Sequence, residues 1–368
     1  MKKYLVGIMF LLLSVYGIEM KADSAPPSAI FGANGECDTT LAGCQVIPLS
    51  LSTLCTVSCA VRVSPSLTSA TRMWGASGYG GSGLCMTSID GGASWAACTS
   101  QPFTTGSVEL YAGAADGSVI AVGSPTGPTT CTIRRSTDNG TNWSDVFTQL
   151  GNCSPASIEG QYLFCLSSGI CELSSFTGGV GLTVIRSSNN GQSWIADAAI
   201  ADGSGCIHAG ASWNDSVGIT VPEATGCGGG GVADTAAADV WTASTIWNGT
   251  QGDCWGTTVL NGVGRGICFA ATNYTLRNST GALVSNLTIP NVLAALDSGG
   301  VAVSPFADTT YFFASTATTI GVWVSRDSMS TFTQLGDIVG SMRGGNAFFA
   351  NGCVYFSGGT AARFAKIC

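Results

Sequence analysis

The chain has 368 residues, a net charge of −8, only 10% charged residues and a hydrophobic fraction of 45%. The acidic balance disfavours nucleic acids and anionic membrane surfaces as partners, because both attract basic proteins. The apolar fraction is too high for a disordered chain, and the 51 glycines favour a β-rich protein with many tight turns.

Residues 1–24 are typical of a secretory signal peptide. Two lysines precede an apolar run from Tyr4 to Ile18, which is shorter than the roughly 20 residues of a membrane span. Cleavage after Gly17 or after Ser24 satisfies the small-residue rule, and we take 25–368 as a single mature domain. We expect a secreted, periplasmic or cell-surface protein of bacterial type, with no membrane span after the signal is removed.

An eight-residue pattern, Ser-x-Asp-x-Gly-x-x-Trp, recurs along the chain. Three close copies and a weaker fourth place these residues at its defining positions: Ser88, Asp90, Gly92 and Trp95; Ser136, Asp138, Gly140 and Trp143; Ser187, Asn189, Gly191 and Trp194; Ser325, Asp327 and Phe332. We expect the Asp or Asn to accept hydrogen bonds from backbone N–H groups one or two residues on, and the Gly to adopt a positive φ. The terminal aromatic then buries apolar surface between sheets. Each copy predicts a structural hairpin turn.

This pattern resembles the Asp box, or bacterial neuraminidase repeat, of sialidase-like β-propellers. The first serines of the four copies are 48, 51 and 138 residues apart, and the last interval equals three steps of 46. Two degenerate copies are expected there, at Leu276–Leu283 and near Asp234–Trp241. A period of about 40 to 50 residues is typical of four-stranded propeller blades. We predict an all-β, seven-bladed propeller of antiparallel blades, with six blades as the alternative.

Strand-like runs separated by turn residues fill the intervals between the boxes. In chain order they are 54–63, 70–76, 83–88, 108–113, 118–123, 129–136, 142–150, 161–167, 181–187, 217–221, 266–271 and 309–315. Residues 169–179 and 224–238 predict excursions outside the sheets. The last 36 residues have room for three strands, and a ring leaves no open edge. The fourth strand is expected from the N-terminal segment, near Phe31 or near Val46.

Sixteen cysteines in a chain with a signal peptide predict disulfides. Neighbours in sequence predict local bridges, although spacing alone leaves the connectivity open. The predicted pairs include Cys85 with Cys98 around the first box, Cys131 with Cys153 around the second, and Cys165 with Cys171. Because the cysteines are scattered and the chain has one histidine, we predict no metal site, and nothing in the sequence indicates a cofactor.

Resemblance to sialidases implies an arginine cluster that grips a sugar carboxylate, a tyrosine nucleophile assisted by a glutamate, and an aspartate acid/base. Glu223, Arg265, Arg343 and Tyr355 follow one another in the order of that family, but the opening Phe-Arg-Ile-Pro motif of the family is absent. An exo-sialidase is therefore the alternative hypothesis. So is another glycoside hydrolase that uses a carboxylate pair among Glu109, Glu159, Glu172 and Glu223.

Resemblance to non-catalytic Asp-box propellers, which include photosystem assembly factors and sortilin-type ectodomains, implies a binding module. Ligands of such folds meet the loops around the face and the central channel. We select four aromatic residues outside the boxes as candidate ligand contacts, with packing between blades as the alternative: Trp74, Tyr111, Trp213 and Trp255. The main hypothesis is a binding module for a glycan or an extracellular protein, in an oligomeric state that the sequence leaves open.

Overall fold

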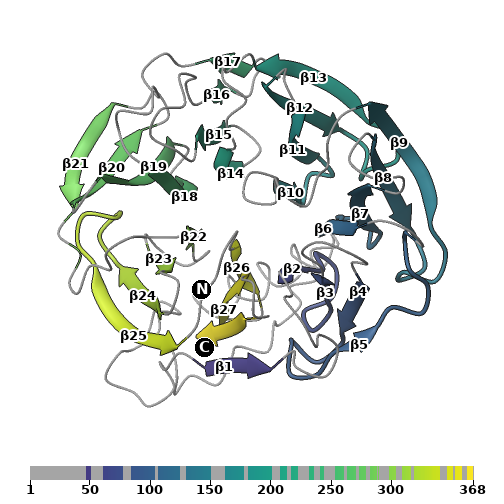
Figure 1. Cartoon of the computed structure of the whole chain (residues 1–368), viewed down its shortest axis with the longest axis horizontal. Coiled ribbons are helices and arrows are strands. Elements are labelled where there is room, and N and C mark those ends of the chain that lie inside the picture. The colour runs from purple at the N-terminus through teal and green to yellow at the C-terminus, as the bar shows by residue number, and fades with distance from the viewer. Residues whose placement is uncertain are drawn as a thin grey trace, which may run out of the picture.

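The computed structural model shows an all-β molecule whose sheets surround a central axis (Figure 1). The structure describes residues 47–50, 61–77, 84–103, 107–124, 130–150, 162–177, 181–200, 208–213, 217–222, 232–235, 241–243, 253–260, 263–270, 273–278, 282–287, 289, 298–303, 309–315, 319–339, 346–350, 353–358 and 363–367. No helix long and apolar enough to cross a membrane occurs among them.

Within these residues the strands form seven antiparallel sheets of four strands each. The first sheet contains β2 to β5 (Val61–Pro65, Met73–Ser77, Leu84–Ser88, Ala96–Ala97), and the second β6 to β9 (Ser107–Gly113, Val119–Ser124, Thr130–Ser136, Ser144–Leu150). The third contains β10 to β13 (Tyr162–Cys165, Cys171–Thr177, Gly181–Ser187, Ile195–Ile200), and the fourth β14 to β17 (His208–Trp213, Val217–Pro222, Val232–Thr235, Trp241–Ala243). The fifth contains β18 to β21 (Asp253–Leu260, Val263–Ala270, Asn273–Asn278, Leu283–Leu287), and the sixth β22 to β25 (Ser298–Val303, Thr310–Ser315, Thr319–Ser325, Thr333–Val339). The seventh contains β26 to β28 (Asn346–Ala350, Cys353–Gly358, Arg363–Ile367) together with β1 (Ile47–Ser50).

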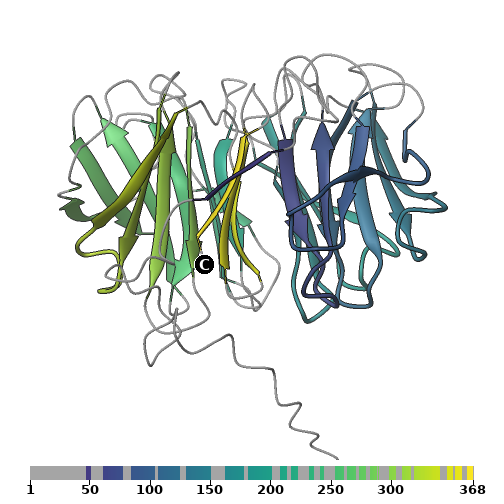
Figure 2. The same ribbon diagram turned by 90° about the horizontal axis from the view of Figure 1, so that it is seen from below.

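The seventh sheet combines strands from distant parts of the chain. β1 pairs antiparallel with β28, so that Ile47 lies opposite Lys366 and Ser50 opposite Arg363. β1 begins directly after Val46, whereas Phe31 lies outside the described residues. The innermost strands stand near the axis, and the sheets extend from one face of the molecule to the other (Figure 2).

Two segments that were expected outside the sheets contain strands. Residues 169–179 were predicted as an excursion, and this prediction is wrong because β11 occupies Cys171–Thr177 and pairs with both β10 and β12. Two consecutive serines, Ser174 and Ser175, interrupt the apolar alternation of β11 and conceal it. β16 likewise lies inside the second expected excursion, 224–238.

Apolar side chains on facing strands fill the spaces between neighbouring sheets. Leu110 and Ile133 of the second sheet belong to one buried cluster with Leu173 and Ile185 of the third. Corresponding clusters join the first sheet to the second, the fifth to the sixth and the sixth to the seventh. Because side chains alternate between the two faces of a strand, each of these sheets presents apolar residues to a neighbour.

Gly191 and Gly140 hold the same box position in different packing environments, and their alanine variants are expected to differ. Their φ angles are 73° and 83°. A Cβ at Gly191 would lie 2.4 Å from Cδ1 of Ile120 in the second sheet, whereas a Cβ at Gly140 would lie 3.4 Å from its nearest neighbour, on Trp143. Both substitutions strain the backbone by about 1 to 3 kcal/mol.

We expect Gly191→Ala to lose about 1 to 3 kcal/mol more than Gly140→Ala, because it also displaces Ile120. Denaturant unfolding of the two variants measures this difference. Equal losses would mean that Ile120 moves aside at no cost.

Candidate functional site

The four boxes occupy equivalent places in their sheets. Each begins at the last residue of the third strand and ends directly before the fourth strand, as Ser136 ends β8 and Ser144 begins β9. The degenerate copy at Leu276–Leu283 also spans the connection between a third and a fourth strand, where Asn278 Oδ1 accepts a hydrogen bond from the Ala282 N–H (3.0 Å). The box turns therefore lie at the same end of their sheets.

The side chains of each box are consumed by its own turn. Ser136 Oγ donates to Asp138 Oδ1 (2.8 Å) and accepts from the Gly140 N–H (2.9 Å). Asp138 Oδ1 accepts from the backbone N–H groups of Thr141 (3.1 Å) and Asn142 (2.8 Å). We expected donors one or two residues after the aspartate, and this was wrong. The donors come three and four residues later, because the serine hydroxyl takes the nearer N–H of the glycine.

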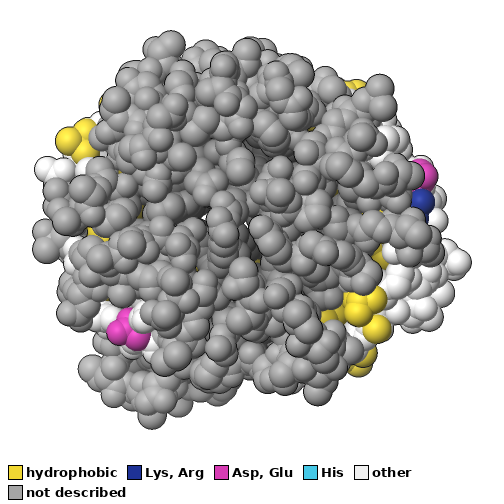
Figure 3. Space-filling view, in the orientation of Figure 1, with side chains coloured by type: hydrophobic (Ala, Val, Ile, Leu, Met, Phe, Trp, Pro, Cys, Tyr) yellow, Lys and Arg dark blue, Asp and Glu magenta, His cyan; other side chains and the backbone are white. Residues whose placement is uncertain are grey.

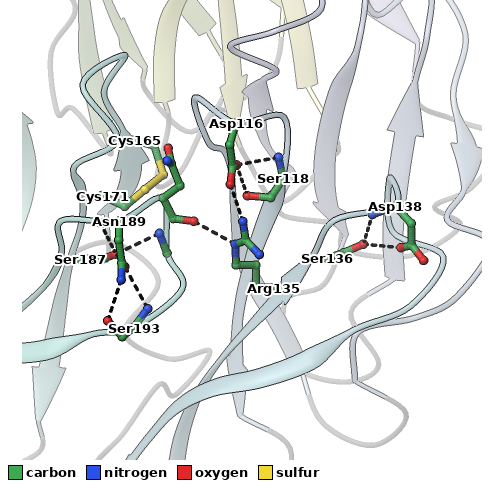
Figure 4. Close-up of polar contacts among 12 residues, drawn as sticks. Asp116, Ser118, Arg135, Ser136, Asp138, Cys165, Cys171, Ser187, Asn189 and Ser193 are labelled. Atoms are coloured by element: carbon green, nitrogen blue, oxygen red, sulfur yellow. Dashed lines mark hydrogen bonds and ion pairs between the residues drawn. A yellow bond between two sulfur atoms is a disulfide. The ribbon is translucent and has the colours of Figure 1, made fainter.

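The third box makes the same contacts without a charge. Asn189 Oδ1 accepts from the Ser193 N–H (3.0 Å), and Asn189 Nδ2 donates to Ser193 Oγ (2.9 Å) (Figure 4). Ser187 Oγ accepts from the Gly191 N–H (2.9 Å). The turn therefore requires acceptor oxygens at this position and not a carboxylate.

Hydrogen bonds lower the pKa of the box aspartates. The pKa of Asp90 falls to about 2, chiefly through the side chain and backbone of Ser94. The pKa of Asp138 also falls to about 2, chiefly through the backbone and side chain of Asn142. These carboxylates are held in the charged form, which suits a structural acceptor and not a proton-transferring acid.

The box tryptophans satisfy their indole N–H groups with backbone carbonyls. Trp194 and Trp95 donate to the glycine of their own box, Gly191 and Gly92, at 3.1 Å each. Trp143 instead donates to the backbone carbonyl of Ser100, in the segment that follows β5 of the first sheet (3.2 Å). Phe332, in the fourth box, is buried in the cluster between the fifth and sixth sheets.

A polar network connects the second sheet to the third box. Arg135, at the end of β8, donates from Nε to the backbone carbonyl of Asn190 (2.9 Å) and pairs through Nη2 with Asp116 (2.5 Å) (Figure 4). Partial burial opposes ionisation of Asp116, but hydrogen bonds from Ser118 and the charge of Arg135 outweigh it and leave its pKa below the ordinary value. Sequence reasoning missed Arg135, although an arginine directly before a box was a visible signal.

A second missed group holds the segment that links the first sheet to the second. Gln101 Oε1 accepts from the Cys85 N–H (2.6 Å) at the edge of β4, where β5 has only two residues. The Arg134 guanidinium lies 4.8 Å from the centre of the Phe103 ring and pairs with Asp145 (2.5 Å). The sequence gives no local sign of these contacts, because the partners are far apart along the chain.

Two of the four residues that follow the chain order of sialidases, Arg265 and Tyr355, lie in the described part of the structure. Arg265 lies in β19 of the fifth sheet and Tyr355 in β27 of the seventh, with the sixth sheet between them (Figure 1). Tyr355 is buried, and its hydroxyl donates to the backbone carbonyl of Gly91 (3.1 Å). Glu223 and Arg343 lie outside the described residues. Of the alternative carboxylates, Glu172 is buried with its Oε1 3.6 Å from Arg186 Nε.

The four aromatic ligand candidates are distributed over four sheets. Trp74 and Tyr111 are buried together in the cluster between the first and second sheets, so their surroundings support the packing alternative. Burial also raises the pKa of the Tyr111 hydroxyl. Trp213 ends β14 and Trp255 lies in β18, with side chains outside the described part of the structure.

The predicted Cys85–Cys98 and Cys165–Cys171 bridges are formed; the first joins β4 to the residue after β5, and the second joins β10 to β11. Cys131 is disulfide-bonded, while its predicted partner Cys153 lies outside the described residues.

The described part of the chain has no group of three or more residues suited to hold a metal ion. On the face in view in Figure 3, the described side chains lie mainly at the rim, where apolar ones gather beside β4 and β5.

We expect the thermal stability of the protein to fall at low pH, where the box aspartates become protonated. A carboxylate with a lowered pKa in the folded state stabilises the fold above its unfolded pKa of about 3.9, and this contribution is lost as the pH falls toward 2. Wild-type protein should therefore lose thermal stability between about pH 4 and pH 2. The doubly substituted Asp90→Asn, Asp138→Asn protein should lose less, because Asn189 shows that asparagine fits the turn.

Melting temperatures at low ionic strength measure this difference, since salt screens exposed charges. Identical pH profiles for the two proteins would show that the box carboxylates do not stabilise the fold through their charge.

Comparisons with known proteins show a likeness of fold. No protein-family model matches the chain, and no curated protein matches it. The structure of YCF48 bound to D1 peptide has a TM-score of 0.59 and 15% identity, covering 88% of this chain and 96% of that one. The crystal structure of a Niastella koreensis GH74 enzyme also has a TM-score of 0.59, with 14% identity, covering 87% of this chain and 53% of that one. The chain therefore has the fold of a β-propeller.

Proposed function

We propose that this chain is an exported seven-bladed Asp-box propeller that acts as a non-catalytic binding module for an extended peptide of an extracellular protein. Residues 1–24 are its signal peptide, and residues 25–368 are one domain that β1 closes. The seven four-stranded sheets and the pairing of β1 with β28 support this organisation. The bridged cysteines fit an oxidising location outside the cytoplasm.

The observation that carries the proposal is that the Tyr355 hydroxyl is buried and already hydrogen-bonded. A sialidase nucleophile has to face its substrate, yet this hydroxyl is buried and donates to the backbone carbonyl of Gly91. The box carboxylates are likewise consumed within their turns. One protein with a similar fold is described as bound to a peptide, which agrees with a peptide ligand, although fold alone does not transfer function.

Binding and turnover assays on residues 25–368 test the proposal. A phage-displayed library of random linear peptides should yield sequences that bind in the micromolar range or tighter, while a fluorogenic sialoside and a soluble β-glucan should remain unhydrolysed. Asp138→Asn is a matched control, since it changes a box turn and should leave binding unchanged at neutral pH. Hydrolysis of either substrate would support the glycoside hydrolase alternative. Selective retention on a glycan array, without peptide binding, would identify a glycan as the ligand.

A further inference from the structure

The seventh sheet faces two neighbours, and alternate residues of β27 divide between them. Val354 and Phe356 belong to the buried cluster shared with the sixth sheet. Tyr355, between them in sequence, points to the opposite side because side chains alternate along a strand. It stacks on Phe348 of β26, with ring centroids 5.3 Å apart and an angle of 11° between the rings.

On that side Tyr355 reaches the first sheet. Its hydroxyl donates to the backbone carbonyl of Gly91 (3.1 Å), a buried contact between residues 264 positions apart. Gly91 is the fourth residue of the first box, and its N–H donates to the Thr71 carbonyl in the β2–β3 turn (2.8 Å). The peptide groups of Gly91 are thus held by its own sheet on one side and by the seventh sheet on the other.

The third box shows the same arrangement inside the ring of sheets. Asn190 is its fourth residue, and its N–H donates to the Gly169 carbonyl in the β10–β11 turn (2.8 Å). Its carbonyl accepts from Arg135 of the preceding second sheet (2.9 Å). Two boxes therefore offer the same carbonyl to the preceding sheet, and two chemically different donors use it.

We propose that Tyr355 is the residue that locks the ring shut, by making at the junction of the last and first sheets the contact that Arg135 makes between the second and third. β1 and β28 join the two ends of the chain within the seventh sheet. That pairing does not attach the seventh sheet to the first. The Tyr355 hydroxyl supplies a directional bond across this junction, and the fourth carbonyl of the first box receives it.

Tyr355→Phe tests this role, because it removes the hydroxyl and preserves the ring that stacks on Phe348. Hydrogen exchange should become roughly tenfold faster in the first box, 88–95, and in β1, while the third box, 187–194, stays unchanged, since loss of a buried donor weakens mainly its local contacts. Arg135→Met should produce the reciprocal pattern, with faster exchange in the third box and unchanged exchange in the first box.

Tyr111→Phe is the matched control. It removes the same atom from another buried tyrosine, whose hydroxyl has no hydrogen-bond partner in the described part of the structure. Its exchange should match wild type at both boxes. Unchanged exchange in Tyr355→Phe, or an equal increase in both boxes, would overturn the proposal. Failure of Tyr355→Phe to fold while Tyr111→Phe folds would support it, because the two changes differ only in the bond that is lost.

Discussion

The hydroxyl of the first serine in each box organises the turns of this molecule. In the second box it donates to the aspartate and accepts from the glycine N–H, so one atom fixes the residues on both sides of the fourth box position. The fourth residue, between the aspartate and the glycine, then has little freedom. In the first and third boxes the N–H of this residue, Gly91 or Asn190, donates to an adjacent turn, and its carbonyl accepts from the preceding sheet. Local turn chemistry thereby determines how sheets are attached to one another.

The sequence predicted those features that depend on neighbouring residues. The boxes, the Cys85–Cys98 bridge and the strands next to Trp143 follow from spacing, turn residues and alternation. Prediction failed where a strand carries polar residues, as in β11, because its two consecutive serines are typical of a loop. It also failed for the contacts of Arg135, of Gln101 and of Tyr355 with Gly91. These contacts join residues far apart in the sequence, which the pattern of apolar and polar residues within one strand does not reveal.

The candidate catalytic residues are the part of the prediction to which the structure adds most. The glutamate, arginines and tyrosine follow the order of the catalytic residues of sialidases. Order along a chain, however, does not determine which residues are close together in a ring of sheets. Tyr355 and Arg265 belong to sheets that are not neighbours, and the polar groups of the boxes are bonded to their own turns. The described polar side chains of the boxes bond within their own turns, and Arg135 and Tyr355 bond to the boxes of neighbouring sheets.

The origin of β1 has a consequence for the order of folding. β1 leaves the ribosome before its partner β28, and the strands β2 to β27 are synthesised between them. The seventh sheet consequently cannot be completed until β28 has been synthesised. Contacts of such large sequence separation slow folding, and during this interval the first sheet and β1 expose edges that can pair with other chains.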